Sequence, residues 1–583
     1  MKLRTSFFNP TAFKKDATRF APVWALYTLF LLLMMTAVLS EKGDYWRASN
    51  LAPLLGPTAV LAMGYALLNA QLLFGDLYNA RLCNALHAMP LRRECWFLTH
   101  VTSGLAFALI PNLLVSLITM PMLGAGWSVA LWWLLAASLQ YLFFFGLAVC
   151  SALCVGNRFA MVLVYALANF LSLLVYWFAY SLFEPLLTGV RILSEPFLNW
   201  CPVYDMTSSN DLVDVLALRA TNMDQPAIQQ IIVGEGWGYL ADCAVLGVVL
   251  LGIALLLYLR RKLECAGDFM AVPVLEPVFL VLFSLTVGAF FQIFSDLFGS
   301  WGKGGDYCFL ALGLAVGFFT GRMLLKRSLR VFQPKAFAGL AVLAAVVALS
   351  LALTALDALG ISRRIPQLTE IKSVTIQSSY GEPDALVLNT DADIQKILDV
   401  HRDAISGAAQ QVPQSQYLLS SEPYYSYVEI ELTYTLTNGS TMSRYYSIAT
   451  DSRAGQVMKE FFTRVECVLG VPEDYLSDLA RTISYTQING TDAYVEGYAD
   501  TVSLLNALAA DCKAGNLAQN WGYHTNDEYV ANIWFEYGVS EERFRSVPIS
   551  VFSSCQNTIQ WMEERGIAFE EERGIAFEPG YLD

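Results

Sequence analysis

A long uncharged stretch sets the fold class of this chain. From Cys95 to Asn157 there is no Asp, Glu, Lys or Arg. A helix crosses the hydrocarbon core of a bilayer with about 20 apolar residues, so this stretch is too long for one membrane span. It divides at Gly124-Ala125-Gly126 into two spans, Phe97–Leu123 and Trp127–Cys154. The sequence therefore predicts a polytopic α-helical membrane protein.

Seven further apolar runs bring the expected number of transmembrane helices to about nine. The run with Arg322 is the weakest of them, because this side chain must extend to the interface. The first run resembles a secretory signal, but its apolar core is longer and a basic leader precedes it. We interpret it as a retained span. The seven runs are Phe20–Ser40, Leu51–Phe74, Phe159–Phe183, Tyr239–Leu259, Val274–Ile293, Tyr307–Leu325 and Ala336–Ala355.

Lysine and arginine residues in the short loops indicate the orientation of the spans. With the N-terminus inside, the inner segments hold 17 basic residues and the outer loops hold 5. The N-terminus is therefore expected in the cytoplasm, and an odd number of spans sends the C-terminal half outside. The long outer loop, residues 184–237, is expected to contain two short helices, Asp211–Leu218 and Gln225–Val233.

The C-terminal half has the composition of an acidic soluble domain. Residues 1–361 carry a net charge of +3 and residues 362–583 carry −17. So acidic a surface argues against nucleic acid as a partner and against docking of this half on anionic lipid. Strand and helix periods recur twice in the same order, which predicts an α+β extracellular domain made of two tandem β-α-β-β-α units.

The expected elements of the two units follow from these periods. An Asn438-Gly439 turn between two alternating runs is the strongest hairpin signal. The first unit is expected to contain strand Ile371–Gln377, helix Asp391–Ser406, strands Tyr427–Leu436 and Met442–Ile448, and helix Ala454–Leu469. The second is expected to contain strand Thr482–Ile488, helix Asp500–Ala514, strands Tyr529–Tyr537 and Phe544–Ser550, and helix Cys555–Arg565.

Tyrosines are concentrated in the first of these units, and Tyr427, Tyr434 and Tyr445 lie on its expected strands. A tyrosine cluster can form a face that binds a peptide or a sugar. Tyrosine is also a favoured strand residue, which explains the same positions equally well. The sequence leaves both interpretations open.

Few polar residues lie within the expected spans. An ionisable residue inside a membrane is a functional candidate, but His100, Asp242 and Glu276 lie near the ends of their spans, where water is close. Uncharged residues such as Asn69 and Asn112 suit hydrogen bonds between helices. We therefore expect interhelical hydrogen bonding and no ion or proton pathway.

The sequence contains no recognisable catalytic motif. A GxxxxGK[ST] phosphate-binding loop, an HExxH zinc motif and a GxSxG nucleophile motif are all absent. The four histidines and eleven scattered cysteines include no CxxC pair and no metal-ligand spacing. We therefore expect a non-catalytic chain that binds no cofactor or metal itself.

Residues 75–95 form a polar segment between two long apolar runs, with a break at Pro90. Most of the segment before this proline has a helical pattern, in which apolar residues recur on roughly one face. These residues are Leu77, Leu82, Leu86 and Met89. Such a helix could push on a soluble partner. Alternatively, the segment is an interfacial loop whose basic residues lie at the lipid headgroups.

Three strings together give the chain a family resemblance: FFNPTAFKKDATRFAPVWALY, LYNARLCNALHAMPLRREC and YLRRKLECAGDFMAVPVLEPVF. They resemble permease subunits of bacterial ABC transporters of the ABC-2 exporter type. The resemblance covers about residues 5–360, and such permeases usually have six core spans. It implies an elbow helix at 1–19, a permease domain at 20–360 and a coupling helix at 75–95. A domain at 362–583 follows.

The resemblance also implies which residues meet a separate cytoplasmic ATPase subunit, on which ATP and Mg²⁺ are bound. The coupling segment supplies Leu77, Tyr78, Arg81, Leu86, His87, Met89, Pro90, Arg92, Arg93 and Glu94. A later inner loop supplies a lesser contact through Arg260, Arg261, Glu264 and Gly267.

The expected function is therefore a permease subunit in a bacterial plasma membrane, paired with an identical or different second permease. ATP-driven closure of the ATPases moves the coupling helices and tilts the spans. Large aromatic residues favour export of a hydrophobic or amphipathic cargo, a lipid or a peptide, although lipid-facing positions explain them as well. These residues are Trp132, Trp133, Phe143, Phe144, Phe145, Trp177 and Phe178. The alternatives are a membrane-tethered sensor that signals to an ATPase without transport, and a membrane-embedded hydrolase.

Overall fold

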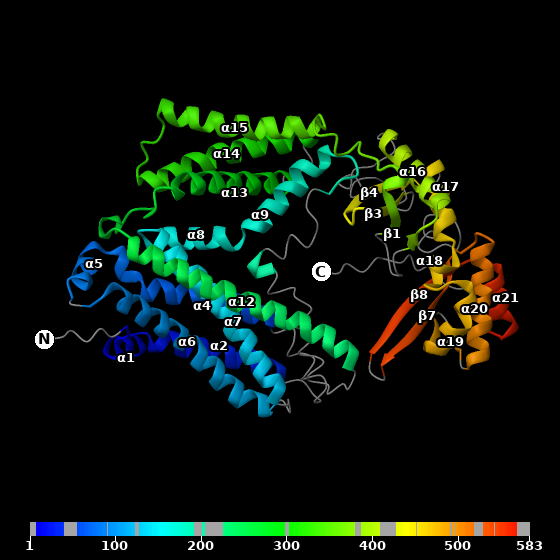
Figure 1. Ribbon diagram of the computed structural model, residues 1–583, viewed down its shortest axis with the longest axis horizontal. Helices are drawn as coiled ribbons and strands as arrows, with labels where there is room; N and C mark the ends of the chain where they lie inside the picture. The colour runs from blue at the N-terminus through cyan, green and yellow to red at the C-terminus, as the bar shows by residue number, and fades with distance from the viewer. Residues whose placement is uncertain are drawn as a thin grey trace. The chain divides into compact units, whose positions relative to one another are not determined.

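Figure 1 shows the computed structural model of the chain, which divides into two units. The first unit comprises residues 1–179 and 193–350, and the second comprises residues 180–192 and 351–583. The structure describes residues 7–39, 55–89, 91–122, 127–191, 201–204, 226–297, 302–378, 386–407, 427–449, 452–489, 493–495, 497–517, 529–540 and 543–567.

The first unit is helical. Among its described residues, six helices are long and apolar enough to cross a membrane, and two bent helix pairs raise this number to eight if each pair is one span. The expected span Leu51–Phe74 corresponds to α4, which is not one of these candidates. The helices of this unit are α1 (Pro10–Arg19), α2 (Ala21–Leu39), α4 (Leu55–Leu73), α5 (Ala80–His87), α6 (Arg93–Met122), α7 (Trp127–Cys154), α8 (Arg158–Asn169), α9 (Leu171–Phe178), α12 (Pro226–Arg260), α13 (Leu275–Leu297), α14 (Gly302–Lys326) and α15 (Pro334–Ala355).

Two of the expected helical segments are bent. The leader forms α1, whose N-terminal N–H groups are capped by the side chain of Asn9, and α2 follows at 61°. The expected span Phe159–Phe183 is broken at Phe170 into α8 and α9, which meet at 57°. It ends in a π-helical turn, Ala179–Phe183.

The expected long outer loop is shorter than the sequence indicates. Gln225–Val233 was expected to be a separate short helix, but residues from Pro226 onward belong to the continuous helix α12. The prediction was wrong because the glycines between this segment and the next apolar run do not interrupt the helix. The other expected helix, Asp211–Leu218, lies outside the described residues.

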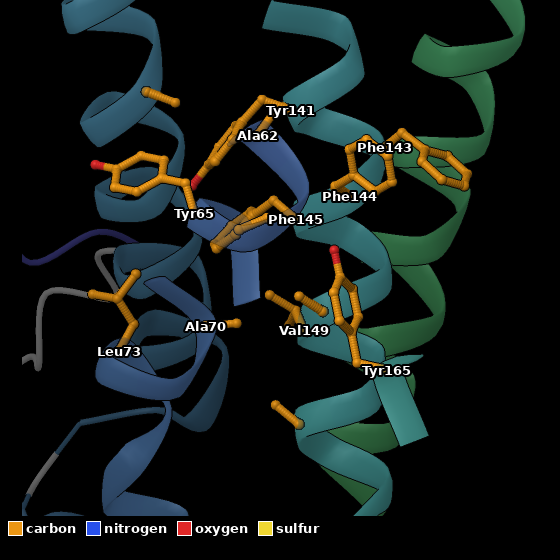
Figure 2. Packing of buried hydrophobic residues seen from close by; sticks show 14 of the residues in the cluster. Ala62, Tyr65, Ala70, Leu73, Tyr141, Phe143, Phe144, Phe145, Val149 and Tyr165 are labelled. Carbon is orange, nitrogen blue, oxygen red and sulfur yellow. The ribbon is translucent and has the colours of Figure 1, made fainter. Parts of the chain in front are cut away.

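The core of the first unit lies where α4, α6, α7 and α12 meet. Side chains from these helices interdigitate there, and Figure 2 shows Tyr65, Tyr141, Phe144 and Phe145 among them. Gly146 of α7 and Gly247 of α12 allow these two helices to approach closely, because a Cβ on Gly146 would lie 2.9 Å from the carbonyl oxygen of Gly247. Removal of one side chain from such a core leaves a cavity and lowers stability.

Most of the large aromatic residues belong to this core. Trp133, Phe144 and Phe145 are 0% exposed, and Trp132 and Phe143 are also buried. They therefore do not face lipid, and the lipid-facing interpretation of these five residues was wrong. Their apolar run gave no sign of this, because a lipid-facing helix and a buried helix are equally hydrophobic.

Polar side chains in the apolar helices bond to one another. The Asn69 amide donates to the Tyr141 hydroxyl at 2.8 Å, and Tyr141 donates to the carbonyl oxygen of Gly104 at 2.9 Å. The Tyr27 hydroxyl donates to the Asn112 side chain at 3.1 Å. These contacts join four helices, and they confirm the prediction of interhelical hydrogen bonding for Asn69 and Asn112.

Helices α13, α14 and α15 lie beside one another in Figure 1. Glycines at every fourth position of α14, namely Gly313, Gly317 and Gly321, pack directly against α13. A Cβ on Gly317 would lie 2.9 Å from the Cα of Ser284. Small residues at this spacing let two helices approach closely in a membrane, where van der Waals packing drives their association.

The described residues of the second unit form two four-stranded sheets with the same topology. Their strand orders are β2-β1-β3-β4 and β6-β5-β7-β8, with antiparallel neighbours throughout. The two tandem β-α-β-β-α repeats were predicted. Each sheet also has a short edge strand that was not predicted, β2 in the first sheet and β6 in the second. The elements are β1 (Ile371–Ser378), β2 (Leu386–Leu388), α16 (Asp391–Ser406), β3 (Tyr427–Leu436), β4 (Thr441–Ala449), α17 (Arg453–Phe462), α18 (Val465–Leu469), α19 (Leu476–Thr482), β5 (Ile483–Asn489), β6 (Ala493–Tyr494), α20 (Tyr498–Lys513), β7 (Tyr529–Ser540), β8 (Arg543–Phe552) and α21 (Gln556–Glu564).

The expected helix Ala454–Leu469 is interrupted between α17 and α18. Arg464 has an extended backbone, and its guanidinium donates to both carboxylate oxygens of Asp393 on α16, at 2.7 and 3.1 Å. This two-point ion pair fixes the chain at the break. The local sequence has a continuous helical pattern, so the interruption depends on a partner that is distant in sequence.

Residues 184–191, which we call the latch segment, also belong to the second unit and lie along strand β4. The backbone N–H of Tyr445 donates to the carbonyl oxygen of Gly189 at 3.1 Å, and the Arg191 guanidinium lies 4.1 Å from the centre of the Tyr445 ring. Gly189 has a φ of +68°, and a Cβ there would collide with the ring of Tyr446. The latch segment therefore covers an edge strand that would otherwise be open.

The core of the first sheet contains a buried histidine. His401 of α16 is 0% exposed, and its Nδ1 lies 2.9 Å from the hydroxyl of Tyr434 on β3. Burial lowers the pKa of His401 to about 4, and the nearby charges of Arg444 and Arg402 act in the same direction. Tyr434 itself is fully buried, so strand packing and not an exposed binding face explains this member of the tyrosine cluster.

We expect the second unit to lose stability as the pH falls from about 6.5 toward 4. The unfolded chain takes up a proton on His401 near pH 6.5, whereas the folded chain does not until about pH 4. This difference corresponds to about 3 kcal/mol over the interval. A His401→Gln variant keeps a hydrogen-bonding side chain and does not titrate. Thermal melting at several pH values should therefore give a shallower acid dependence for the variant, and equal slopes would contradict the prediction.

Candidate functional site

The candidate coupling segment begins with a short buried turn. Residues Gly75–Tyr78 form the 3-10 helix η1, in which Leu77 is 6% exposed. The Tyr78 hydroxyl lies 3.1 Å from the sulfur of Met161, on α8, and 3.4 Å from the carbonyl oxygen of Ala152, near the end of α7. The segment is therefore seated on the ends of α7 and α8 before its exposed part begins.

Arg261 joins this turn to two long helices. It follows the last residue of α12, and its guanidinium donates to the carbonyl oxygens of Leu153 at 2.8 Å, Ala152 at 3.3 Å and Leu77 at 3.5 Å. Arg93 donates in turn to the carbonyl oxygens of Leu259 and Arg261, at 3.4 and 3.3 Å. We call Leu77, Arg93, Leu153 and Arg261 the arginine cluster.

The positive charge of Arg261 is favourable at the end of α7. Burial lowers its pKa, and the nearby Tyr78 opposes this shift. The guanidinium nevertheless remains charged, because arginine loses its proton only at very alkaline pH. A cation is favourable next to the carbonyl groups that end α7, since these groups carry the negative end of the helix dipole.

The loops after α7 and α12 also pair through their backbones. Val155 and Met270 form an antiparallel bridge, and the N–H of Gly267 donates to the carbonyl oxygen of Gly156 at 2.8 Å. A Cβ on Gly156 would collide with the carbonyl oxygens of Cys265 and Asp268, so only glycine fits there. Gly267 adopts a φ of +99°, which also favours glycine.

The exposed part of the segment is α5 and the turn that follows it. Asn79 caps α5, because its side chain accepts the N–H of Arg81 at 3.0 Å. Leu82 is 49% exposed, and Cys83 is buried. The predicted single apolar stripe was wrong in this respect: Leu77 is buried in η1, whereas Leu82 and Met89 are exposed. The break between η1 and α5 separates them.

The exposed surface combines apolar and basic side chains. Leu82, Met89 and Leu91 are between 38% and 49% exposed, and Arg81 and Arg92 are exposed beside them in sequence. We call these five residues the docking face. A surface with apolar side chains and flanking charges is typical of sites that bind another protein.

The remaining predicted site residues have different positions. Glu94 is half-buried in the first turn of α6, Arg260 and Glu264 are exposed, and Arg93 and Arg261 belong to the arginine cluster. Arg93 therefore stabilises the fold and is not part of the docking face. Pro90 and the side chains of Leu86 and His87 lie outside the described residues.

A polar contact that was not predicted from the sequence holds α1 against α6. Asp16 is 8% exposed, and one oxygen of its carboxylate lies 3.0 Å from Nδ1 of His100 and 3.1 Å from the hydroxyl of Ser103. The N–H of Asn9 donates to the hydroxyl of Thr99 at 3.1 Å. The sequence signal for this contact was Asp16 itself, the one acidic residue in the basic helix α1. A carboxylate that becomes buried needs a polar partner.

No group of three or more His, Cys, Asp or Glu residues that could hold a metal ion occurs in the described part of the chain. The thiol of Cys83 is buried next to the arginine cluster, and burial raises its pKa. A thiol with a raised pKa is a poor nucleophile. No protein-family model, curated protein or solved structure matches the chain.

Proposed function

We propose that the chain is the permease subunit of an ABC exporter of the ABC-2 type, and that its docking face contacts a separate ATPase subunit in the cytoplasm. One observation carries the proposal: an exposed apolar and basic helix, α5, is attached through a buried turn to the ends of two long apolar helices. A lipid-facing interfacial loop does not need such an attachment.

The arginine cluster would carry force from α5 into the membrane helices. Leu77 is bonded to Arg261, which is also bonded to the end of α7 and follows α12 directly. Helices α7 and α12 in turn pack closely at Gly146 and Gly247. A push on α5 would therefore move α7 and α12 together, because packed helices shift as rigid elements and not by continuous deformation.

Contacts between distant segments support the topology that we propose. Asp16 of α1 bonds to His100, about two turns into α6, so α1 and the start of α6 lie near one face of the bilayer. We infer that α2 and α4 both cross the membrane, so that α4 would be a span. Leu77 and Leu153 are joined through Arg261, so α6 and α7 also return the chain to that face.

A contact in the second unit supports the proposed topology on the opposite side of the membrane. The latch segment follows α9 and is bonded to β4, so both lie on one side of the membrane. Four candidate spans, α12 to α15, lie between them, and an even number returns the chain to the side from which it started. Together with α2, α4, α6, α7 and the bent pair α8–α9, these four helices would make nine crossings, and the C-terminal half would then be extracellular.

The cargo that we propose is hydrophobic or amphipathic, a lipid or a peptide. The described spans of the first unit supply uncharged polar groups that bond to each other, such as Asn69 with Tyr141. The buried aromatic residues fill the helix core, so the route would lie between two permease subunits or along their lipid faces. ATP and Mg²⁺ are used by the partner ATPase.

A sensor that signals to the ATPase without transport is the second candidate, and the latch segment favours it. Ligand binding to the first sheet could act directly on the segment that follows α9, because Tyr445 and Gly189 are hydrogen-bonded. This candidate predicts a ligand-dependent change in ATPase activity in vesicles that show no ATP-dependent movement of lipid or peptide.

The docking face can be tested by a double substitution, Leu82→Glu and Arg92→Glu. Both residues are exposed, so we expect normal membrane insertion. The amount of ATPase that co-purifies with the full-length chain should fall at least tenfold, because burying a leucine contributes about 2 kcal/mol and both substitutions place a carboxylate in the contact. Quantitative mass spectrometry of the purified complex measures this ratio.

A matched control reverses basic charge elsewhere on the same side. Lys14→Glu and Lys15→Glu change two exposed residues of α1, and they should leave the ATPase ratio unchanged. An unchanged ratio in the Leu82 and Arg92 variant would contradict the assigned docking face. A wild-type chain that co-purifies with no ATPase would contradict the proposed function.

A further inference from the structure

The turn between α14 and α15 is strongly basic. Residues 322–335 contain five lysines and arginines and no acidic residue. Lys326, Arg327, Arg330 and Lys335 are exposed. No salt bridge involves any of these residues in the part of the chain that the structure describes. The turn therefore presents a concentrated positive charge that no carboxylate of the described fold neutralises.

The turn is also folded tightly, so these charges are held close together. Arg327 has a φ of +51°, and the N–H of Arg330 donates to the Ser328 hydroxyl at 3.1 Å. Val331 is 0% exposed and pins the turn, whereas its neighbours Leu329 and Phe332 are 79% and 60% exposed. Apolar side chains beside basic ones suit the boundary between headgroups and acyl chains.

Arg322 extends the basic cluster into the gap between the two helices. Its guanidinium lies 5.7 Å from the ring centre of Phe318, and a Cβ on Gly339 of α15 would lie 3.9 Å from its Nη1. Its Nε is buried and has no hydrogen-bond partner among the described residues. A buried charged donor needs an acceptor, and a phosphate oxygen is a suitable one.

We propose that the α14–α15 turn binds the phosphate headgroup of an anionic phospholipid. Arg322 would meet a phosphate oxygen between the helices, the exposed basic residues of the turn would surround the headgroup, and Leu329 and Phe332 would contact its acyl chains. Basic pockets between transmembrane helices bind anionic headgroups in this way. The site does not depend on the proposed export function, since none of its residues belongs to the docking face.

The test uses the full-length chain in nanodiscs of phosphatidylcholine with a minor fraction of phosphatidylglycerol. The triple variant Lys326→Gln, Arg327→Gln and Arg330→Gln should retain at least fivefold less phosphatidylglycerol per chain by native mass spectrometry. The control Lys14→Gln, Lys15→Gln and Arg19→Gln removes the same charge from exposed positions of α1. It should lower retention less than twofold.

Three outcomes would overturn the proposal. The first is equal loss of phosphatidylglycerol in the triple variant and its control, which indicates general attraction of charge. The second is displacement of the lipid by millimolar inorganic phosphate, which indicates a site for a free anion. The third is a loss of co-purifying ATPase in the triple variant with lipid retention unchanged, which assigns the turn to a protein partner.

The Arg322→Lys variant should weaken retention while insertion stays normal, because lysine keeps the charge without the guanidinium fork.

Discussion

An Arg261→Met variant is expected to insert into the membrane but to lose the attachment of η1 and α5 to the long helices. Arg261 donates to three carbonyl oxygens, and methionine has a similar length and no donor. Hydrogen bonds from a charged group contribute about 1.5 to 3 kcal/mol each. The two shorter bonds, to Leu153 and Ala152, therefore give an expected loss of about 3 to 6 kcal/mol in the arginine cluster. Hydrogen exchange of the full-length chain should show at least tenfold faster exchange in Leu77–Cys83 and at the end of α7.

The neighbouring Lys262→Met variant is the matched control, because Lys262 is exposed and no hydrogen bond to a distant segment holds it in the described structure. It should leave exchange in these segments unchanged. If the coupling proposal holds, Arg261→Met should also retain the ATPase while the rate of ATP hydrolysis no longer responds to cargo. Wild-type exchange in Leu77–Cys83 of the Arg261 variant would contradict the role of this arginine.

The second large loss of stability is expected from Asp511→Ala, on helix α20 beside the sheet β6-β5-β7-β8. Asp511 of α20 is 0% exposed, and its carboxylate accepts the N–H and Oγ1–H of Thr558 at 2.8 and 2.6 Å. It also accepts the N–H and the side-chain amide of Asn557, at 3.0 and 2.8 Å. One carboxylate from α20 therefore caps the N-terminus of α21 and meets its helix dipole.

Alanine leaves these buried donors without an acceptor, so we expect a loss of about 3 to 5 kcal/mol in this unit. The measurement is hydrogen exchange of α21 and β8 in the full-length chain, which should accelerate by at least tenfold. Asp500→Ala is the control on the same helix, because Asp500 is half exposed and its ion pair with Arg565 is solvent-screened. Equal effects of the two substitutions would show that burial of Asp511 does not matter.

The sequence predicted the elements of the C-terminal half closely because their signals are local. Helix Asp391–Ser406 and strand Tyr427–Leu436 have the predicted bounds, and Gly439 adopts the positive φ that the predicted hairpin turn requires. Alternation on a strand and apolar spacing on a helix are set by residues a few positions apart. Edge strands as short as β6 carry too little of either pattern to be recognised.

The helical half was predicted in outline and corrected in detail. Charge-free runs located the long helices, but the bend at Phe170 and the long N-terminal extension of α12 were not anticipated. Hydropathy also could not separate a lipid-facing aromatic residue from a buried one, and Trp133 and Phe145 proved to be buried. Both environments are apolar, so composition carries no information on which of them a side chain occupies.

For the candidate site, too, one part was predicted from the sequence and another was decided by the tertiary structure. Chain order and charge alone selected residues 75–95, and the family resemblance of three sequence strings indicated the loop after α12. Only the tertiary structure separated Arg93 and Arg261, which bond to carbonyl oxygens of distant segments, from Arg92, which is exposed. The physical reason is that a guanidinium is the same group in both places, and its role depends on whether the fold brings acceptors to it or leaves it in water.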